Sequence, residues 1–329
     1  MTSSSLRHFL RDDDLDPEQQ ARVLGLAARL KASPYAERTL AGPRTVAVLF
    51  DKPTLRTQAS FASGIAELGG FPMIIDGSLA KVGVRESISD TARVLGRQAS
   101  MVVWRTYEQE RLEVMTEYAG VPVVNALTDL FHPCQALADL LTIQEHRGDL
   151  AGQTITFVGD PSCNMGHSYL LAGATAGMHV RVSGPEAYRP DETVLARAQE
   201  IATRTGGSAD YVGDPTEAAS GAGVLATDTW VSMGRESEAE ARAEVFAPWQ
   251  LNDALLAVAA DDAVVLHCLP AHRGKEITAE VIDGPRSVVW DEAENRRHVQ
   301  KAVMVWLLSS SVELPSVEPV ETTPEAGAS

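Results

Sequence analysis

The chain has 329 residues, of which 44% are hydrophobic and 22% are charged, values that are ordinary for a globular protein. Its 45 acidic and 28 basic residues give a net charge of −17. So acidic a chain binds nucleic-acid backbones and anionic membrane surfaces poorly, and we expect neither as a partner. A small anionic ligand would need a few individually placed arginine or lysine side chains, so the positions of these residues are informative.

Features that bear on processing and compartment are few. The chain has three cysteines, at the distant positions Cys134, Cys163 and Cys268. An odd number without close spacing argues against a disulfide framework or a zinc site. No apolar run approaches the ~18 residues of a membrane span, and the first residues lack the apolar core of a signal peptide. We therefore expect a cytoplasmic protein. Residues 309–329 hold three prolines, four glutamates and no basic residue, which predicts a disordered tail.

Short β-branched runs alternate with helical patterns along the chain. Asp16 before Pro17 is typical of a helix start, because the carboxylate caps amides and proline has no N–H to leave unpaired. The predicted strands are 45–50, 71–75, 101–104 and 121–125 in the first half, and 154–158, 180–183, 223–227, 263–267 and 287–290 in the second. Helices are predicted over 60–68, 87–95, 108–118 and 133–146.

This alternation defines the fold class. Apolar strands separated by helices predict parallel sheets covered on both faces. The join falls near 148–152, after the helix that ends at 146. We expect an α/β protein of two doubly wound parallel-sheet domains with a cleft between them, domains 1–148 and 149–292. Ligands of such folds bind at the carboxyl ends of the strands.

Anion-compatible side chains follow three strands of the first half. The stretch 51–58, DKPTLRTQ, places hydroxyls and Arg56 at a helix start, where free amides also attract anions. Taken alone, a polar loop with a capping threonine explains this stretch about equally well. However, Arg105 ends the third strand, and His132 and Gln135 open a helix after the fourth. Three such strand ends in a row predict a pocket for a small phosphate with an adjacent carbonyl.

The second half offers different chemistry. Residues 159–166, GDPSCNMG, follow a strand and open a helix but lack the G-x-G-x-x-G spacing, so they favour a dinucleotide site only weakly. Asp228 follows the strand ending at Thr227, and its carboxylate is suited to an ammonium group. The motif 267–270, HCLP, follows another strand; its alternative interpretation is a strand end with an inert buried thiol. Both halves together suggest group transfer from a phosphate-activated donor to an amine.

At these residues the sequence resembles the aspartate/ornithine carbamoyltransferase family, up to about Leu308. Residues 54–58, TLRTQ, are similar to its S-T-R-T-R carbamoyl phosphate motif, and 132–135, HPCQ, match its H-P-x-Q motif. Asp228 with 232–234, SMG, and the HCLP stretch resemble motifs of the ornithine branch, as do 87–96 and 294–296. The resemblance implies carbamoyl phosphate and L-ornithine as substrates, with no cofactor and no metal.

The resemblance also implies a role for each matching residue. Arg56, Arg105, His132 and Cys268 would be catalytic. The carbamoyl phosphate site would comprise Thr54, Leu55, Arg56, Thr57, Lys81, Arg105, His132, Gln135, Leu269 and Arg296. The ornithine site would comprise Asn164, Asp228, Ser232, Met233 and Cys268. Domain 1–148 would bind carbamoyl phosphate, domain 149–292 would bind ornithine, and a helix over 293–308 would pack back on the first domain.

The family implies a homotrimer, in which the loop 78–83 of one subunit completes the anion site of its neighbour through Lys81. Gln58 replaces the last arginine of the anion motif, and Lys81 stands where the ornithine branch has glutamine or histidine. These departures leave open a carbamoyltransferase for another acceptor (a modified ornithine, lysine or putrescine) and a binding protein without activity. A Rossmann-type oxidoreductase is the alternative from a different enzyme class, and the absent G-x-G-x-x-G spacing and the donor-rich strand ends disfavour it. Asp228 favours an α-amino acid over putrescine.

Overall fold

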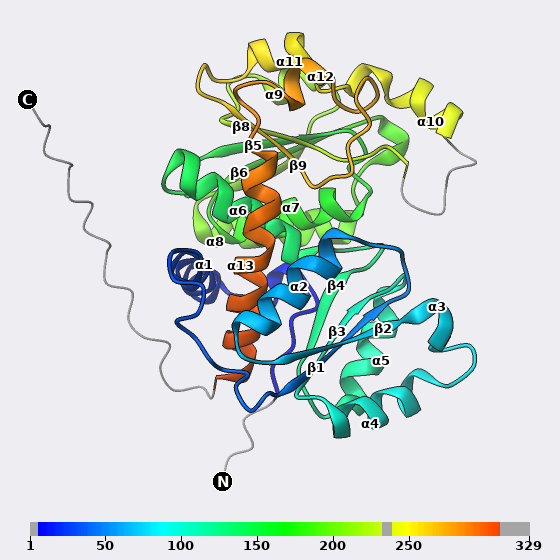
Figure 1. Ribbon diagram of the computed structural model, residues 1–329. Coiled ribbons are helices and arrows are strands. Elements are labelled where there is room, and N and C mark those ends of the chain that lie inside the picture. The colour runs from blue at the N-terminus through cyan, green and yellow to red at the C-terminus, as the bar shows by residue number, and fades with distance from the viewer. Residues whose placement is uncertain (1–5, 232–238, 310–329) are drawn as a thin grey trace, which may run out of the picture.

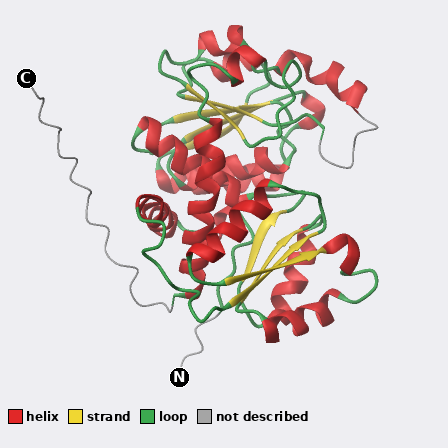
Figure 2. Ribbon diagram, viewed as in Figure 1, coloured by secondary structure: helices red, strands yellow, loops and turns green. Residues whose placement is uncertain are grey.

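The structure, a computed structural model, describes residues 6–231 and 239–309 (Figure 1). It contains two parallel sheets with helices on both faces, as expected (Figure 2). The first sheet has the order β2-β1-β3-β4, with β1 (Thr45–Phe50), β2 (Phe71–Asp76), β3 (Met101–Arg105) and β4 (Val123–Leu127). The second has the order β7-β6-β5-β8-β9, with β5 (Thr154–Val158), β6 (His179–Ser183), β7 (Ser208–Tyr211), β8 (Val224–Thr227) and β9 (Val264–His267).

Each sheet has one point at which the strand order reverses. In the first sheet β1 pairs with β2 on one side and with β3 on the other, all parallel. In the second sheet β5 lies between β6 and β8 in the same way. Connections leave such a strand pair toward opposite faces, which opens a crevice at the carboxyl ends where ligands bind. The topology thus points to the ends of β1 and β3 and of β5 and β8.

The longer helices cover both sheets and the region between them. They are α1 (Pro17–Ala32), α2 (Arg56–Glu67), α4 (Ile88–Gln98), α5 (Gln109–Ala119), α6 (Pro133–Arg147), α7 (Asn164–Thr175), α8 (Glu192–Thr205), α10 (Ala239–Phe246) and α13 (Val289–Leu308). Short helical segments are η1 (Asp12–Asp14), α3 (Gly77–Ala80), η2 (Glu186–Tyr188), α9 (Pro215–Ala219), η4 (Ala247–Trp249), α11 (Asp253–Val258) and α12 (Ala279–Ile282). The Asp16 carboxylate accepts from Gln19 N at 2.8 Å, so the predicted cap of α1 is confirmed.

One hydrophobic cluster runs through both halves of the chain. It joins residues of β1 and α2 to residues of α6, α7 and α13 and continues into β5 and β6. Because α6 and α7 pack on each other and α13 packs on α6, the two sheets share this core. The domain boundary at 148 remains a prediction.

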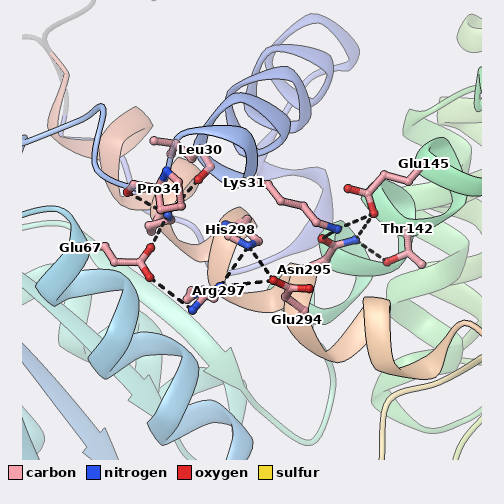
Figure 3. A network of polar contacts seen from close by, with 11 residues as sticks. Leu30, Lys31, Pro34, Glu67, Thr142, Glu145, Glu294, Asn295, Arg297 and His298 are labelled. Carbon is pink, nitrogen blue, oxygen red and sulfur yellow. Dashed lines mark hydrogen bonds and ion pairs between the residues drawn. The ribbon is translucent and has the colours of Figure 1, made fainter. Parts of the chain in front are cut away.

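Polar contacts join helix α13 to α1, α2 and α6 of the first half (Figure 3). Asn295 donates to Thr142 Oγ1 on α6 at 2.9 Å and accepts from Lys31 Nζ on α1 at 2.8 Å. Lys301, which is fully buried, pairs with Glu67 on α2 and donates to the Leu30 carbonyl at 3.2 Å. These contacts lie on both sides of Arg296 along the helix and fix where its side chain projects.

Two predicted elements need correction. The predicted strand 287–290 is wrong, because Ser287 forms only an isolated bridge with Val265 and α13 begins at Val289. Asp291 and Glu292 in the first turn stabilise a helix N-terminus there, which outweighs the β propensity of the Val-Val-Trp run. Strand β7 was not predicted, because Ser208–Tyr211 is a short edge strand without an apolar run. The remaining strands and helices are confirmed, with shifts of a few residues at their ends.

Candidate active site

Two guanidinium groups from distant parts of the chain meet at one hydroxyl. Thr57, in the first turn of α2, accepts from Arg296 Nη2 at 2.8 Å and from Arg105 Nη1 at 3.4 Å. Arg105 ends β3, and Arg296 comes from the middle of α13. All three side chains are buried. The Nε atoms of both arginines lack a hydrogen-bond partner among the described residues. The cluster of Thr57, Arg105 and Arg296, which we call the anion corner, can therefore still donate to an anion.

The turn between β1 and α2 adds further donors. Thr54 Oγ1 accepts from Thr57 N at 3.4 Å, while no side chain caps the helix at Leu55. The Leu55 side chain is 79% exposed, so only its backbone can serve a site. Arg56 Nε is buried and has no hydrogen-bond partner in the described part of the chain. The free amides and partial positive charge of this helix start favour a phosphate.

His132 and Gln135 open α6 beside this corner. Pro133 has no backbone N–H that a capping group would have to satisfy, and the His132 side chain makes no capping hydrogen bond. Its Nδ1 is buried without a hydrogen-bond partner in the described residues, while its backbone N donates to Ser168 Oγ at 2.9 Å. Gln135 is fully buried, and its Oε1 atom likewise has no partner among the described residues. Both side chains therefore have unused polar atoms.

The pKa values of this corner follow from burial and from like charge. Burial and the neighbouring Arg296 lower the pKa of Arg105 to about 10, so its guanidinium remains charged at neutral pH. Burial, Arg296 and Arg105 lower the pKa of His132 well below its ordinary value. His132 is therefore a neutral imidazole at pH 7, which can donate one hydrogen bond without adding charge.

The second sheet brings Asp228 and Cys268 together at its carboxyl edge. Asp228 directly follows β8, Cys268 directly follows β9, and their side chains are hydrogen-bonded. Burial and the Asp228 carboxylate raise the pKa of the Cys268 thiol well above its ordinary value. Leu269 has a left-handed φ of 57°, which turns the backbone sharply after Cys268. Asn164, at the start of α7, donates to the Thr128 carbonyl at 2.8 Å.

The donor atoms of Asp228, His267 and Cys268 lie within 4.8 Å of one another, a spacing that a metal ion could use. Their chemistry does not favour one. Both ring nitrogens of His267 are occupied, since Nδ1 accepts from Leu269 N at 2.9 Å and Nε2 faces Glu276 Oε1 at 3.2 Å. The raised pKa of Cys268 also keeps its thiol protonated, whereas metals bind the thiolate.

One expected site residue lies apart from the others within this chain, and two fall outside the described residues. Lys81 is exposed, has a left-handed φ of 48°, and follows α3 in the loop beside the edge strand β2. Ser232 and Met233 lie outside the described residues. Gln58 is exposed on α2. An arginine here would form at most an exposed pair, worth about 1 kcal/mol or less, so its loss within one subunit is modest.

Two buried carboxyl groups behind Gln135 were not predicted. Gln135 Nε2 donates to Asp139 Oδ1 at 2.8 Å and to Glu292 Oε1 at 2.9 Å. Glu292 Oε2 in turn accepts from His267 N at 2.8 Å. Two spacings could have pointed to them, because Asp139 lies four residues after Gln135 on α6 and Glu292 four before Arg296 on α13, one helical turn in each case.

A cluster of anion-compatible donors on one α/β sheet, facing a carboxylate with a thiol on a second, is typical of a two-domain group-transfer enzyme. Residues 7–145 match the family model described as aspartate/ornithine carbamoyltransferase, carbamoyl-P binding domain. Residues 151–307 match the model for the Asp/Orn binding domain of the same family. The chain therefore belongs to the aspartate/ornithine carbamoyltransferase family and is a carbamoyltransferase.

Individual relatives agree with this assignment. The ornithine carbamoyltransferase of Clavibacter michiganensis is 62% identical over 305 residues, which cover 93% of this chain and 99% of that protein. The crystal structure of ornithine carbamoyltransferase from Gloeobacter violaceus is 46% identical, with a TM-score of 0.83 over 92% of this chain and 99% of that one. An acetylornithine transcarbamylase complexed with acetylcitrulline shares the fold at 29% identity, with a TM-score of 0.84 over 93% of this chain and 100% of that one.

Proposed function

We propose that this enzyme transfers the carbamoyl group of carbamoyl phosphate to the δ-amine of L-ornithine, giving L-citrulline and phosphate. One observation carries the proposal. Glu292 links the two sheets at their carboxyl ends, because it accepts from Gln135 Nε2 at 2.9 Å, at the start of α6, and from His267 N at 2.8 Å, at the end of β9 and directly before Cys268. The anion corner of one sheet and the carboxylate of the other therefore border a single site.

Carbamoyl phosphate binds with its phosphate at the start of α2, where Thr54, Arg56 and Thr57 lie with the backbone of Leu55. Arg105 and Arg296 bridge the phosphate and carbamoyl groups, because both already point at Thr57 Oγ1. His132 donates to the carbamoyl oxygen, and Gln135 accepts from the carbamoyl NH₂ together with the carbonyls near Cys268 and Leu269. Lys81 of a neighbouring subunit adds positive charge.

L-Ornithine binds second, against the other sheet. Asp228 holds the α-ammonium group, Asn164 with Ser232 and Met233 holds the rest of the amino acid, and Cys268 lies near the δ-amine. The neutral δ-amine attacks the carbamoyl carbon, and Thr57, Arg105 and His132 stabilise the charge that develops on the carbonyl oxygen. The C–O bond to phosphate then breaks, and the departing phosphate takes the proton of the amine, so no protein base is required. Positioning of the two reactants supplies up to ~7–11 kcal/mol.

The anion site is completed in a homotrimer. Apolar side chains are exposed around β2 and the loop that carries Lys81: Phe71 is 56%, Leu79 77% and Val84 82% exposed. An apolar patch of this kind at a sheet edge favours burial against another copy of the chain. No described helix is both long and apolar enough to cross a lipid bilayer. We place the enzyme in the cytoplasm, in arginine biosynthesis.

The test is product formation from carbamoyl phosphate with L-ornithine, run beside N-acetylornithine, lysine, putrescine and aspartate. Turnover with L-ornithine alone is the expected result. A preference for another amine would replace the acceptor but keep the donor site. Binding of carbamoyl phosphate without turnover of any amine would overturn the proposal.

A further inference from the structure

The amide of Gln135 can adopt only one orientation in its surroundings. Its nitrogen faces two carboxyl oxygens, Asp139 Oδ1 at 2.8 Å and Glu292 Oε1 at 2.9 Å. An amide NH₂ has two hydrogens and both are used here, whereas an amide oxygen in that place would face acceptors without a proton to share. The amide oxygen must therefore point the other way, where it is buried and has no partner among the described residues.

The two carboxyl groups are themselves held in place. Asp139 is on α6, one turn from Gln135, and Glu292 is on α13, one turn from Arg296. The Glu292 carboxylate also accepts from His267 N at 2.8 Å, at the end of β9. Both carboxyl groups are at most 1% exposed. Burial and their mutual repulsion raise the pKa of Glu292 well above its ordinary value. The two carboxyl groups are also hydrogen-bonded to each other, so a proton that they retain lies between them and is not available to Gln135.

We infer that Asp139 and Glu292 are positioning residues for donor selectivity: they fix the Gln135 oxygen as an acceptor that requires an NH₂ group on the donor. The inference rests on the proposed function. It adds a physical reason why the site rejects acyl phosphates other than carbamoyl phosphate. Acetyl phosphate has the shape and charge of carbamoyl phosphate, with a methyl group in place of the NH₂. A methyl group leaves a buried acceptor unpaired, which sites of this kind reject strongly.

Glu292→Gln and Asp139→Asn test this inference. In Glu292→Gln, His267 N keeps the amide oxygen on its own side, so an NH₂ group faces Gln135 and allows its amide to turn over. Asp139→Asn weakens the other acceptor, because an amide oxygen accepts less strongly than a carboxylate. Asp291→Asn is the matched control, because it removes the exposed carboxylate next to Glu292, which pairs with His146 and not with Gln135. Three constants are measured for each protein: the KM for carbamoyl phosphate and the inhibition constants of acetyl phosphate and inorganic phosphate against it.

In the wild type and in Asp291→Asn, we expect carbamoyl phosphate to be preferred strongly over acetyl phosphate. In Glu292→Gln and Asp139→Asn, the KM for carbamoyl phosphate rises by about fivefold or more, the effect of about one hydrogen bond. The inhibition constants of acetyl phosphate and phosphate stay within twofold, since both ligands report on the anion corner. A rise in the KM for carbamoyl phosphate without a rise in the two inhibition constants distinguishes this role from a general disruption of the structure.

Two outcomes overturn the inference. If all three constants rise together, the carboxyl pair merely supports the anion corner. If none changes in a variant that retains its fold, the orientation of Gln135 does not depend on the pair. Citrulline formation by the wild type is measured in the same experiment, so a failure of the proposed function is seen in the wild type and a failure of this inference only in the variants.

Discussion

Arg296 donates to Thr57 Oγ1 at 2.8 Å, although 239 positions separate the two residues in the sequence. The contact joins the last helix of the fold to the first turn of α2, where the anion motif lies. Arg105 reaches the same oxygen from a third element. A hydroxyl oxygen that accepts from two guanidinium groups still has its own O–H to donate to an anion, so Thr57 orients the cations and contributes a donor.

Replacing Arg296 with lysine tests the need for the guanidinium fork at this corner. Lysine keeps the charge but lacks the planar fork, which presents separate nitrogen donors to Thr57 and to a ligand, so we expect kcat/KM for carbamoyl phosphate to fall about 100-fold or more. Steady-state kinetics measures this. Arg297→Lys, the adjacent position that pairs with Glu67 and Glu294, is the control and should change little. A loss below threefold in Arg296→Lys would count against the corner as the phosphate site.

Asp228→Asn removes the charge that we expect to hold the α-ammonium group of ornithine. The KM for ornithine should rise at least tenfold and kcat should fall, because a buried charge-assisted hydrogen bond contributes about 1.5–3 kcal/mol. The KM for carbamoyl phosphate should change less than threefold, since the donor binds first and at the other sheet. Equal rises of both KM values would show that Asp228 maintains the structure of the whole site and does not bind ornithine specifically.

The same carboxylate controls the reactivity of Cys268. Asp228 is one cause of the raised pKa of that thiol, after burial itself. The wild-type thiol should therefore react slowly with iodoacetamide at pH 8, and Asp228→Asn should accelerate the reaction severalfold because more thiolate is present. Mass spectrometry of the peptide containing Cys268 gives the rate. Cys134, whose pKa burial raises to about 12, is the internal control and should stay unmodified in both proteins.

The pair of Asp139 and Glu292 predicts how stability depends on pH. Burial raises the pKa of Asp139 to about 6, above its ordinary value, so the folded protein holds a proton that the unfolded chain has lost. This contribution is fully present below about pH 4 and disappears as the pH rises through 6. Asp139→Asn removes it, so the Tm of the variant relative to the wild type should be several degrees higher at pH 8 than at pH 5. A difference independent of pH would be the contrary result, and Glu110→Gln, an exposed carboxylate on α5, serves as control.

The proposed sharing of sites between the subunits of a trimer predicts complementation between two defective variants. Arg56→Ala should abolish activity through the subunit's own site, and Lys81→Ala should reduce it about tenfold or more through the neighbour's site. When the two are unfolded together, mixed and refolded, random assembly leaves about a quarter of the sites with both residues intact. Activity of the mixture above that of either variant alone is expected. No gain in a mixture shown to contain hybrid trimers would place Lys81 outside the site.

Much of this arrangement could be predicted from the sequence, because it depends on local patterns. Strand β1 and its donor-rich end follow from an apolar run and a polar turn, and the Asp16–Pro17 cap follows from two adjacent residues. The resemblance to a family supplied Arg296, which no local pattern ties to Thr57. The carboxyl pair behind Gln135 could not be predicted, since acidic residues on helices are usually solvated and only packing of α13 on α6 buries these.

The position of Arg296 has a consequence for biosynthesis. A ribosome must add 295 residues before it reaches this arginine, and both sheets are complete by residue 267. A nascent chain can therefore form its strands while Arg105 and Thr57 still lack their third partner and the surface that α13 covers on α1, α2 and α6 is bare. The cluster of Thr57, Arg105 and Arg296 is complete only when α13 has left the exit tunnel and docked, so the docking of this helix is also the step that assembles the proposed binding site.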